Sequence, residues 1–519
     1  MDRNQARPAT GQTRSVPSWL GTLVIIATYA ALIASTNTSF TMLDDESNSI
    51  AIAGRPVAHA LQPFLSLDGY RELHPPETEI IWHLWLVATQ YSFALLRLPA
   101  NLFFIGAILF TAKSAEKLAG RNAYWATLLV GFAWPFAFQY GRIAGWYTLS
   151  TFLLSVVTWM YLNIVEDRTQ WWWAPFAASC VIFVWSNYFG FVFLALLLAD
   201  LAIFHRTVAS RRLRPLAITM GVVVVSFLPL LRVAFADVGE YLGSSGSDMR
   251  LGHEVATVGY PTFAIFGSAA VAPWFLPLSV PVLVAAIALG IAIVRSAARR
   301  WLIYVACAML AMELARVYDI KRVLIFLPWI FLAIGLTATR GVSQNPWIAR
   351  GAICVLILAG WIGILSGNHY ATSNLKEPWG NVASMVAEDA RHGATIISEN
   401  PPFFLYLDYQ LGLQSMMQGA DSSDLGEDFY RAHGYTIAEP DQTGDQAKSL
   451  RGKIVLVNGS GVLEEVEAMN ALKDALARRC SVLGEYRAAP DPAFAWKRRF
   501  TSDVPALAYR TDVTWFDCN

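Results

Sequence analysis

The sequence predicts a polytopic α-helical membrane protein with a C-terminal α/β domain. The 519-residue chain is 55% hydrophobic and only 15% charged, whereas an average soluble domain has roughly 25% charged residues. The deficit is concentrated in residues 18–366, where many apolar runs are long enough to cross a hydrocarbon core of about 30 Å. A membrane β-barrel would instead need alternating segments of about ten residues. The formal net charge is zero, so nothing indicates a nucleic-acid partner.

Apolar runs divided by short polar loops predict about 11–13 transmembrane helices within residues 1–366. The first run has no convincing cleavage site, so we expect an uncleaved first span. Breaks at Arg97-Leu98-Pro99 and between Pro273 and Pro281 predict two broken or re-entrant pairs. The expected spans are 18–36, 79–96, 99–112, 123–138, 145–163, 172–186, 189–204, 215–235, 260–276, 278–297, 301–315, 322–338 and 348–366.

Lys and Arg in short loops predict the orientation of the chain, because cytoplasmic loops carry an excess of these residues. The loops at 37–78, 139–144 and 316–321 then face outward, and so does everything after residue 366. The basic segments that we place in the cytoplasm are the N-terminus, Lys113 to Arg121, Arg206 to Arg214, Arg295 to Arg300 and Arg340 to Arg350.

Residues 367–519 differ in kind and predict a small α/β domain on the outer face. Short apolar segments at 395–398 and 453–458 predict buried strands, and 380–391 and 462–478 predict helices. The acidic, Gly- and Ser-rich stretch 420–447 predicts an exposed loop region. If this domain is extracytoplasmic, Cys480 and Cys518 can form one disulfide.

An acidic cluster, Asp44-Asp45-Glu46, stands just past the end of the first apolar run. A carboxylate at a membrane rim can act as a general base toward an acceptor hydroxyl. Mutual repulsion among three acids raises the pKa of at least one of them, which suits a base. The alternative is a structural role, because acids are also favoured at the N-terminus of a helix.

His74-Pro75-Pro76 precedes the second apolar run, and Glu77 follows it. Two prolines fix the backbone and deliver the chain rigidly into the next helix. An acid at the start of a span is costly in lipid, so Glu77 is expected at the rim or facing a cavity. Helix initiation by proline is the structural alternative.

Two basic segments on the predicted outer side are candidate anion sites. Arg142, five residues before Tyr147, can bind a phosphate or can simply extend to the membrane rim. Lys321 and Arg322 break the expected charge asymmetry of an outward loop, which favours binding of a lipid phosphate or pyrophosphate. Ion pairing to nearby acids such as Asp319 is the alternative.

Taken together, these elements resemble the GT-C superfamily of membrane glycosyltransferases. The resemblance is strongest to the bacterial branch related to protein O-mannosyltransferases and to aminoarabinose transferases of lipid A. The motifs occur in the order typical of that branch, and the ordered set is more specific than any one of them. The matching segments are Asp45-Glu46, His74-Pro75-Pro76, Arg97-Leu98-Pro99, Lys117 to Arg121, Arg142 to Tyr147 and Arg322 to Pro328.

Three positions depart from the family pattern. Glu77 stands where the family has an apolar residue after the two prolines, and Val323 replaces a tyrosine in the late motif. Asp44 extends the acidic pair to a triplet, which leaves open whether Asp44 or Asp45 is the base. Alignment of the motif favours Asp45, with Glu46 as its neighbour.

The resemblance implies an inverting glycosyltransferase of the bacterial inner membrane, with its active site and C-terminal domain facing the periplasm. Its donor would be a sugar on a polyprenyl phosphate, and its acceptor a glycan, glycolipid or protein of the cell envelope, such as lipopolysaccharide. Asp45 or Asp44 would deprotonate the acceptor hydroxyl beside Glu46. No second Asp-x-Asp motif is present to hold a cation, so we expect no metal or other cofactor.

The same resemblance implies the substrate-binding residues. Positive groups must stabilise the departing lipid phosphate, where the largest charge develops. The substrate-binding candidates are His74, Glu77, Arg142, Tyr147, Lys321 and Arg322.

Two other classes of protein remain open. A transporter or carrier of lipid-linked sugars would explain the spans, but not the ordered motifs or the acids at the rim; no internal repeat supports it. An envelope assembly factor would use the C-terminal domain to bind a partner.

Overall fold

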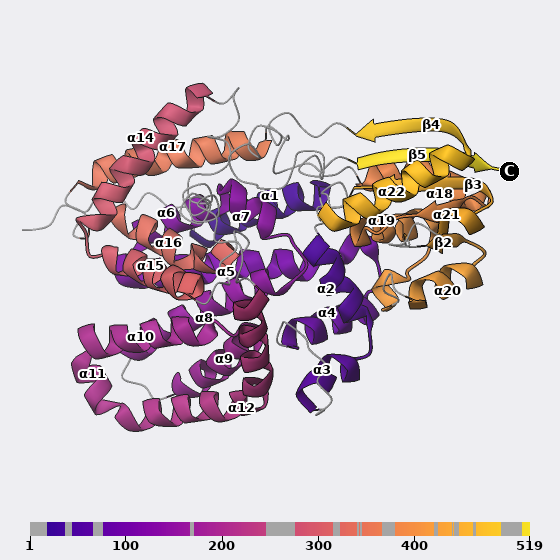
Figure 1. The fold of residues 1–519 in the computed structure, drawn as a ribbon. Coiled ribbons are helices and arrows are strands. Elements are labelled where there is room, and N and C mark those ends of the chain that lie inside the picture. The colour runs from indigo at the N-terminus through magenta and orange to yellow at the C-terminus, as the bar shows by residue number, and fades with distance from the viewer. Residues whose placement is uncertain are drawn as a thin grey trace, which may run out of the picture.

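The protein folds into a large helical body and a smaller C-terminal domain built on a mixed β-sheet (Figure 1). The structure is a computed structural model. It describes residues 18–36, 44–65, 76–166, 171–244, 276–314, 322–339, 342, 345–365, 379–419, 424–438, 440, 446–459, 463–488 and 511–519.

Within these residues, five helices are long and apolar enough to cross a membrane. A bent pair, α14 (Leu276–Val294) with α15 (Arg299–Leu314), can make a sixth span. This confirms a polytopic α-helical membrane protein, whereas the count of about 11–13 spans stays a prediction. The five are α1 (Ser18–Thr36), α5 (Leu98–Ala119), α8 (Trp146–Glu166), α12 (Leu213–Ser244) and α17 (Pro346–Leu365).

Shorter helices complete the body. Several of them are apolar but have fewer than 18 residues, which is why sequence runs outnumber the long spans. They are α2 (Asp44–Gly54), α3 (Val57–Leu65), α4 (Glu77–Ala88), α6 (Arg121–Phe132), α7 (Pro135–Tyr140), α9 (Trp173–Ser186), α10 (Gly190–Phe204), α11 (Arg206–Arg211) and α16 (Val323–Thr337).

The two predicted chain breaks have different outcomes. At the first, α4 ends at Ala88, a 3-10 turn η1 (Phe93–Leu95) follows, and α5 begins at Leu98, so the break at Arg97 is confirmed. At the second, α14 begins at Leu276 and runs through Pro281, so a break at Pro281 is wrong, while a break at Pro273 stays a prediction. The 103° bend between α14 and α15 falls at the basic segment 295–300 that separates the expected spans 278–297 and 301–315. Residues 260–275 lie outside the described residues.

Ser296 explains the position of that bend. Its hydroxyl donates to the Ile293 carbonyl at 2.8 Å and accepts from the Ala298 amide at 3.1 Å. A serine that bonds the backbone on both sides offers the chain a turn in place of a continuous helix. The serine therefore ends one helix and begins the next.

Helix α16 is the centre of the helical body, since all of its residues are buried. A helix that is apolar on every side must be surrounded by other elements. Gly335 allows the closest approach, because a Cβ there would lie 1.9 Å from the Thr127 hydroxyl of α6. A side chain at this position would force the two helices apart.

The C-terminal sheet has five strands in the order β2-β1-β3-β5-β4. Strands β2, β1 and β3 are parallel, with Thr395 paired to both Thr436 and Ile454, and β5 is antiparallel to β3 and to β4. The predicted strands at 395–398 and 453–458 are thus confirmed. The strands are β1 (Thr395–Ile397), β2 (Thr436–Ala438), β3 (Gly452–Asn458), β4 (Ser481–Ala488) and β5 (Thr511–Cys518).

Helices cover both faces of the sheet. On one face, Ile454 and Leu456 pack against Leu472 of α22 (Leu463–Arg479). Alternate residues of β3 point the other way, so Val455 packs with α18 (Trp379–Arg391) and α19 (Pro401–Leu411). The predicted helices at 380–391 and 462–478 are therefore confirmed.

The prediction of an exposed loop at 420–447 is wrong for its described residues. They form α20 (Asp424–Ala432), β2 and α21 (Gln446–Ser449). Within α20, Asp428 and Arg431 are exposed, whereas Tyr430 is buried in the domain core. The disulfide between Cys480 and Cys518 is confirmed.

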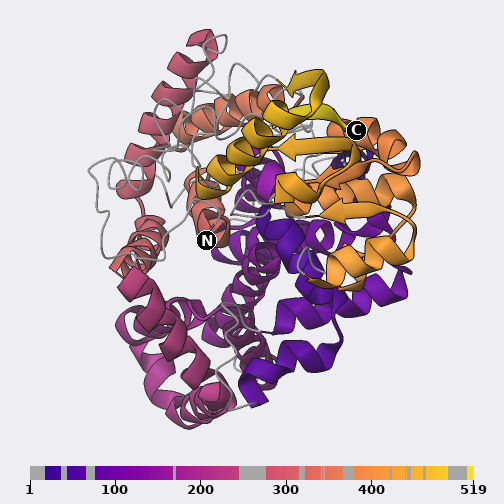
Figure 2. The same ribbon diagram turned by 45° about the vertical axis from the view of Figure 1, so that its right-hand side comes forward.

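Helix α2 lies between the helical body and the C-terminal domain (Figures 1 and 2). Ile50 and Ala53 of α2 share one hydrophobic cluster with Trp82 of α4, Leu96 before α5 and Tyr406 of α19. The segment carrying the acidic cluster is therefore packed from both sides.

Candidate functional site

The acidic cluster forms the first turn of α2, which begins at Asp44. The side chains of Asp44 and Asp45 lie outside the described part of the structure, and so do His74 and Lys321. The described part of the site is built from Glu46, Glu77, Arg142, Tyr147 and Arg322.

Glu46 is fully buried, and both of its carboxylate oxygens are engaged. Arg97 donates through Nε to Oε1 at 2.7 Å and through Nη2 to Oε2 at 2.6 Å. The Ala144 amide also donates to Oε1, at 2.8 Å. A bidentate, charge-assisted pair of this kind fixes orientation as well as charge. Glu46 thereby ties α2 to the start of α5 and to the turn between α7 and α8.

Arg142 lies in that same turn and is also fully buried. Its Nε donates to the Phe138 carbonyl at 3.0 Å, and its Nη1 donates to the Thr36 hydroxyl at 2.7 Å. Burial and the neighbouring Arg97 charge lower the pKa of Arg142, while the Glu46 charge opposes that change. The guanidinium therefore links the end of α1 to the turn and contributes positive charge next to the Glu46–Arg97 pair.

Tyr147 and Arg322 meet through Trp146. The ring centroids of Trp146 and Tyr147 are 4.0 Å apart, and the Arg322 guanidinium carbon lies 5.7 Å from the Trp146 ring. Arg322 is half-buried and precedes the first residue of α16. The structure thus brings the two family-like segments at 142–147 and 322–328 together.

Glu77 is the first residue of α4. Burial raises the pKa of its carboxyl to about 8, so at neutral pH the group keeps its proton and can donate a hydrogen bond. Its Oε2 is buried and has no hydrogen-bond partner among the described residues. On the same helix, His83 bonds the Ala53 carbonyl through Nδ1 at 2.9 Å, which joins α4 to α2.

Sequence reasoning placed Arg97 in a turn motif but missed its role, and it missed Tyr406 entirely. The Tyr406 hydroxyl, on α19 of the C-terminal domain, accepts a hydrogen bond from the Arg97 guanidinium. The signal for Arg97 was a charged residue between two apolar runs, which marks functional positions in membrane segments. Tyr406 gave no signal, because one tyrosine in an amphipathic helix is an ordinary core residue.

A second buried cluster lies elsewhere in the helical body, around Asp200 of α10. Asp200 accepts hydrogen bonds from the hydroxyls of Tyr161 and Tyr304, each at 2.5 Å. Arg300 and His205 lie 3.5 and 3.6 Å from its oxygens. Tyr161 of α8, Tyr304 and Arg300 of α15, and His205 just after α10 surround one carboxylate of α10, which makes this cluster a link between helices.

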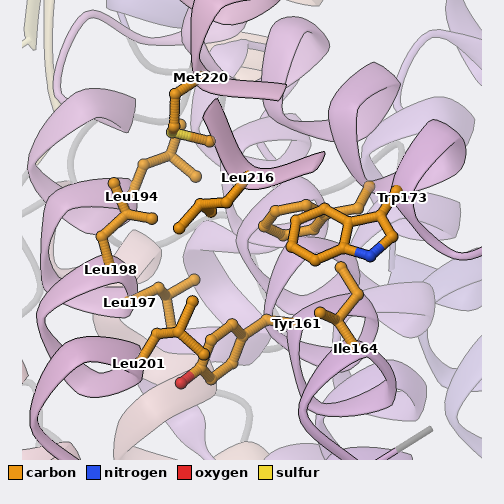
Figure 3. Close-up of a pocket in the computed structure, with 10 residues that line it drawn as sticks. Tyr161, Ile164, Trp173, Leu194, Leu197, Leu198, Leu201, Leu216 and Met220 are labelled. Carbon is orange, nitrogen blue, oxygen red and sulfur yellow. The ribbon is translucent and has the colours of Figure 1, made fainter. Parts of the chain in front are cut away.

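An apolar pocket borders that cluster (Figure 3). Tyr161 closes one end of the pocket, opposite Met220, and its hydroxyl points away toward Asp200. The pocket is separate from the Glu46–Arg97 pair. Its lining residues are Tyr161, Ile164, Trp173, Phe176, Leu194, Leu197, Leu198, Leu201, Leu216 and Met220.

No protein-family model and no curated protein sequence matches the chain. Solved structures do match its fold. ArnT from Cupriavidus metallidurans in the apo state is 12% identical with a TM-score of 0.51, and the match covers 96% of this chain and 98% of that one. ArnT bound to undecaprenyl phosphate gives 11% identity, the same coverage and a TM-score of 0.50.

An oligosaccharyltransferase from Archaeoglobus fulgidus is similar at 11% identity, over 90% of this chain and 72% of that one, with a TM-score of 0.44. The two ArnT structures match nearly end to end, from the first helix through the C-terminal sheet domain. The expected resemblance is confirmed at the level of the fold: the chain has the same fold as the two ArnT structures.

Proposed function

We propose that this protein is an inverting glycosyltransferase that moves a sugar from a polyprenyl-phosphate donor to an envelope glycan, glycolipid or protein. The observation that carries the proposal is the Glu46 carboxylate, bound by Arg97 and by the Ala144 amide. This network holds the first turn of α2, with Asp44 and Asp45, against the turn that carries Arg142. A fixed acid next to a fixed basic segment is what general-base catalysis with an anionic leaving group requires.

Asp45 is assigned as the general base. Its carboxylate takes the proton of the acceptor hydroxyl, and the hydroxyl oxygen forms a bond to the anomeric carbon of the sugar. The bond from that carbon to the phosphate oxygen breaks from the opposite face, so the configuration inverts. Glu46 is a positioning residue, because both of its oxygens already accept hydrogen bonds inside the protein.

The leaving phosphate carries the charge that develops in this step. Arg322, half-buried beside Trp146, and Lys321 are assigned to bind it. Arg142 acts on the phosphate through its charge and not by direct contact. Its Nε and Nη1 donate hydrogen bonds within the protein, and its side chain is fully buried. Its charge still favours an anion nearby, since a buried charge is weakly screened. His74, Glu77 and Tyr147 are assigned to the sugar.

The choice of donor is supported by ArnT, which shares this fold and has been solved bound to undecaprenyl phosphate. The orientation is supported by the disulfide between Cys480 and Cys518, because disulfides persist in oxidising compartments such as the bacterial periplasm. We therefore place residues 367–519 in the periplasm and residues 1–366 in the inner membrane.

The test is transfer of radiolabelled sugar from a panel of polyprenyl-phosphate sugars to a membrane extract. The purified wild-type protein is compared with Asp45→Asn and Asp44→Asn, which differ by one position. We expect transfer to be lost in Asp45→Asn and kept in Asp44→Asn, and the donor that reacts names the sugar. Loss only in Asp44→Asn would move the base by one residue. Binding of a labelled donor without any transfer would overturn the proposal in favour of a carrier of lipid-linked sugars.

A further inference from the structure

We infer that the C-terminal domain contributes to the catalytic site. Its Tyr406 positions the acidic turn of α2 through a hydrogen bond with Arg97. This inference rests on the proposed glycosyl transfer for its effect on rate. That the C-terminal domain fixes the position of α2 does not depend on any activity, because it is argued from contacts between this domain and the helical body.

The first contact between the C-terminal domain and α2 is a continuous chain of hydrogen bonds. The Arg97 guanidinium donates a hydrogen bond to the Tyr406 hydroxyl, and it also donates to both carboxylate oxygens of Glu46. Glu46 follows Asp45 directly in the first turn of α2. One hydroxyl on α19 is therefore separated from the acidic turn by a single guanidinium. Tyr406 is also nearly fully buried, so water does not compete for this bond.

The second contact is steric and lies at the other end of α2. A Cβ at Gly54 would be 2.4 Å from the Gly419 amide and 2.6 Å from the Met417 carbonyl. Gly419 has a positive φ of 82°, a backbone conformation that favours glycine. The turn η5 (Met416–Gln418) thus contacts the backbone of α2 directly. The C-terminal domain therefore contacts the last turn of α2 directly and acts on its first turn through Arg97.

The contacting segment is itself held rigidly. Asp408 is fully buried and accepts hydrogen bonds from the hydroxyls of Ser415 and Tyr430, the latter at 2.7 Å. The hydroxyl oxygens of Ser415 and Tyr430 lie 3.0 Å apart beside this carboxylate. Asp408 lies two residues after Tyr406, so this network fixes α19 and the segment leading to η5 together. A satisfied buried network of this kind specifies one arrangement.

Position matters here because proton transfer and attack are sensitive to misplacement of about 1 Å. A helix held by these contacts presents its first turn at a fixed place. Without the Tyr406 hydroxyl, the Arg97 side chain can adopt other rotamers, and Glu46 moves with it. We expect a slower chemical step with little change in donor binding.

The chain offers a matched control for the test. Tyr406 and Tyr409 both contact Phe93, with ring centroids 5.3 and 4.7 Å apart. Tyr409 is half exposed on the same helix. Tyr406→Phe and Tyr409→Phe remove the same atom and keep both ring contacts, while only the first removes the bond to Arg97.

Two readouts are measured on the full-length protein in detergent. The first is amide hydrogen exchange of the peptide covering residues 44–54, which does not depend on any activity. The second is kcat and KM for the polyprenyl-phosphate sugar that the wild-type protein uses. We expect Tyr406→Phe to speed exchange in this peptide and to lower kcat about tenfold, with KM unchanged. Tyr409→Phe should match the wild type.

The outcomes separate this inference from the proposed function. If both variants match the wild type in exchange and in kcat, the positioning role is overturned. If kcat falls while exchange stays unchanged, the hydroxyl acts on the substrate, which also overturns it. If the wild type transfers no sugar from any donor, the proposed function fails. The exchange difference between the two variants then still decides whether the domain positions α2.

Discussion

The Glu46 carboxylate and the Arg97 guanidinium pair side by side inside the protein, with 2.7 Å between Oε1 and Nε and 2.6 Å between Oε2 and Nη2. Neither side chain reaches solvent to any extent. Two charges removed from water are stable only when each fully satisfies the other. The pair therefore makes the position of α2 depend on α5, and a change in either residue leaves a buried charge.

The first prediction concerns this pair. Glu46→Ala should lower the free energy of unfolding by about 3–5 kcal/mol, because Arg97 is left buried without its partner. The control is Glu116→Ala, which breaks an exposed pair with Lys113 at 2.8 Å and should cost about 1 kcal/mol or less. Thermal melting of the two purified variants makes the comparison. Equal melting temperatures would show that the pair does not stabilise the fold.

The helices and two of the strands could be predicted from the sequence because each depends on a local pattern. Apolar runs placed α1 and α17 within two residues of their observed bounds, and the short apolar segment before Asn458 placed β3. The motif at 142–147 was also local. The hydrogen bond that its Ala144 amide donates to Glu46 could not be predicted, because no periodicity relates two positions so far apart in the sequence.

The positioning contacts could not be predicted for the same reason. Arg97 was visible as a charge between apolar runs, but its choice of Glu46 over Glu77 or Glu79 is made by tertiary packing. The boundary between α14 and α15 was predicted from the basic residues at 295–300, whereas the hydrogen bonds of Ser296 that form the bend could not be predicted. Composition likewise misplaced α20 in a loop, since its polar face outweighs the buried Tyr430.

The second prediction is a pH dependence set by Glu77. Burial raises the pKa of this carboxyl to about 8 in the folded state, whereas an unfolded glutamate titrates near its ordinary value of about 4.3. Between these values the folded state binds more protons, so this group lowers stability as pH rises. Glu77→Gln removes the effect, and the melting temperature of the variant relative to the wild type should increase from pH 5 to pH 8.

The control for that experiment is Glu116→Gln, at an exposed glutamate that pairs with Lys113 on the protein surface. The difference in melting temperature between this variant and the wild type should not change over the same pH range. If Glu77→Gln also gives a flat difference, the carboxyl is ionised in the folded protein and the proposed uncharged role toward the sugar is wrong.

The third prediction tests the buried cluster around Asp200. Asp200→Ala leaves the hydroxyls of Tyr161 and Tyr304 without their acceptor, and each unsatisfied buried group costs about 1–3 kcal/mol. We expect a large fall in melting temperature, while Asp474→Ala on the exposed side of α22 should change little. Similar melting for both variants would mean that the cluster does not hold α8, α10 and α15 together.

The fourth prediction joins the disulfide to activity. Cys480 and Cys518 are 38 residues apart and tie the junction of α22 and β4 to the end of β5. Closing a loop of this length stabilises a fold by about 3–4 kcal/mol. Because the same domain packs on α2, Cys480→Ser should lower both the melting temperature of the domain and the rate of sugar transfer. Cys307→Ser, at a free cysteine of α15, should change neither. A variant that melts earlier but transfers sugar at the wild-type rate would show that the domain can loosen without disturbing the acidic turn.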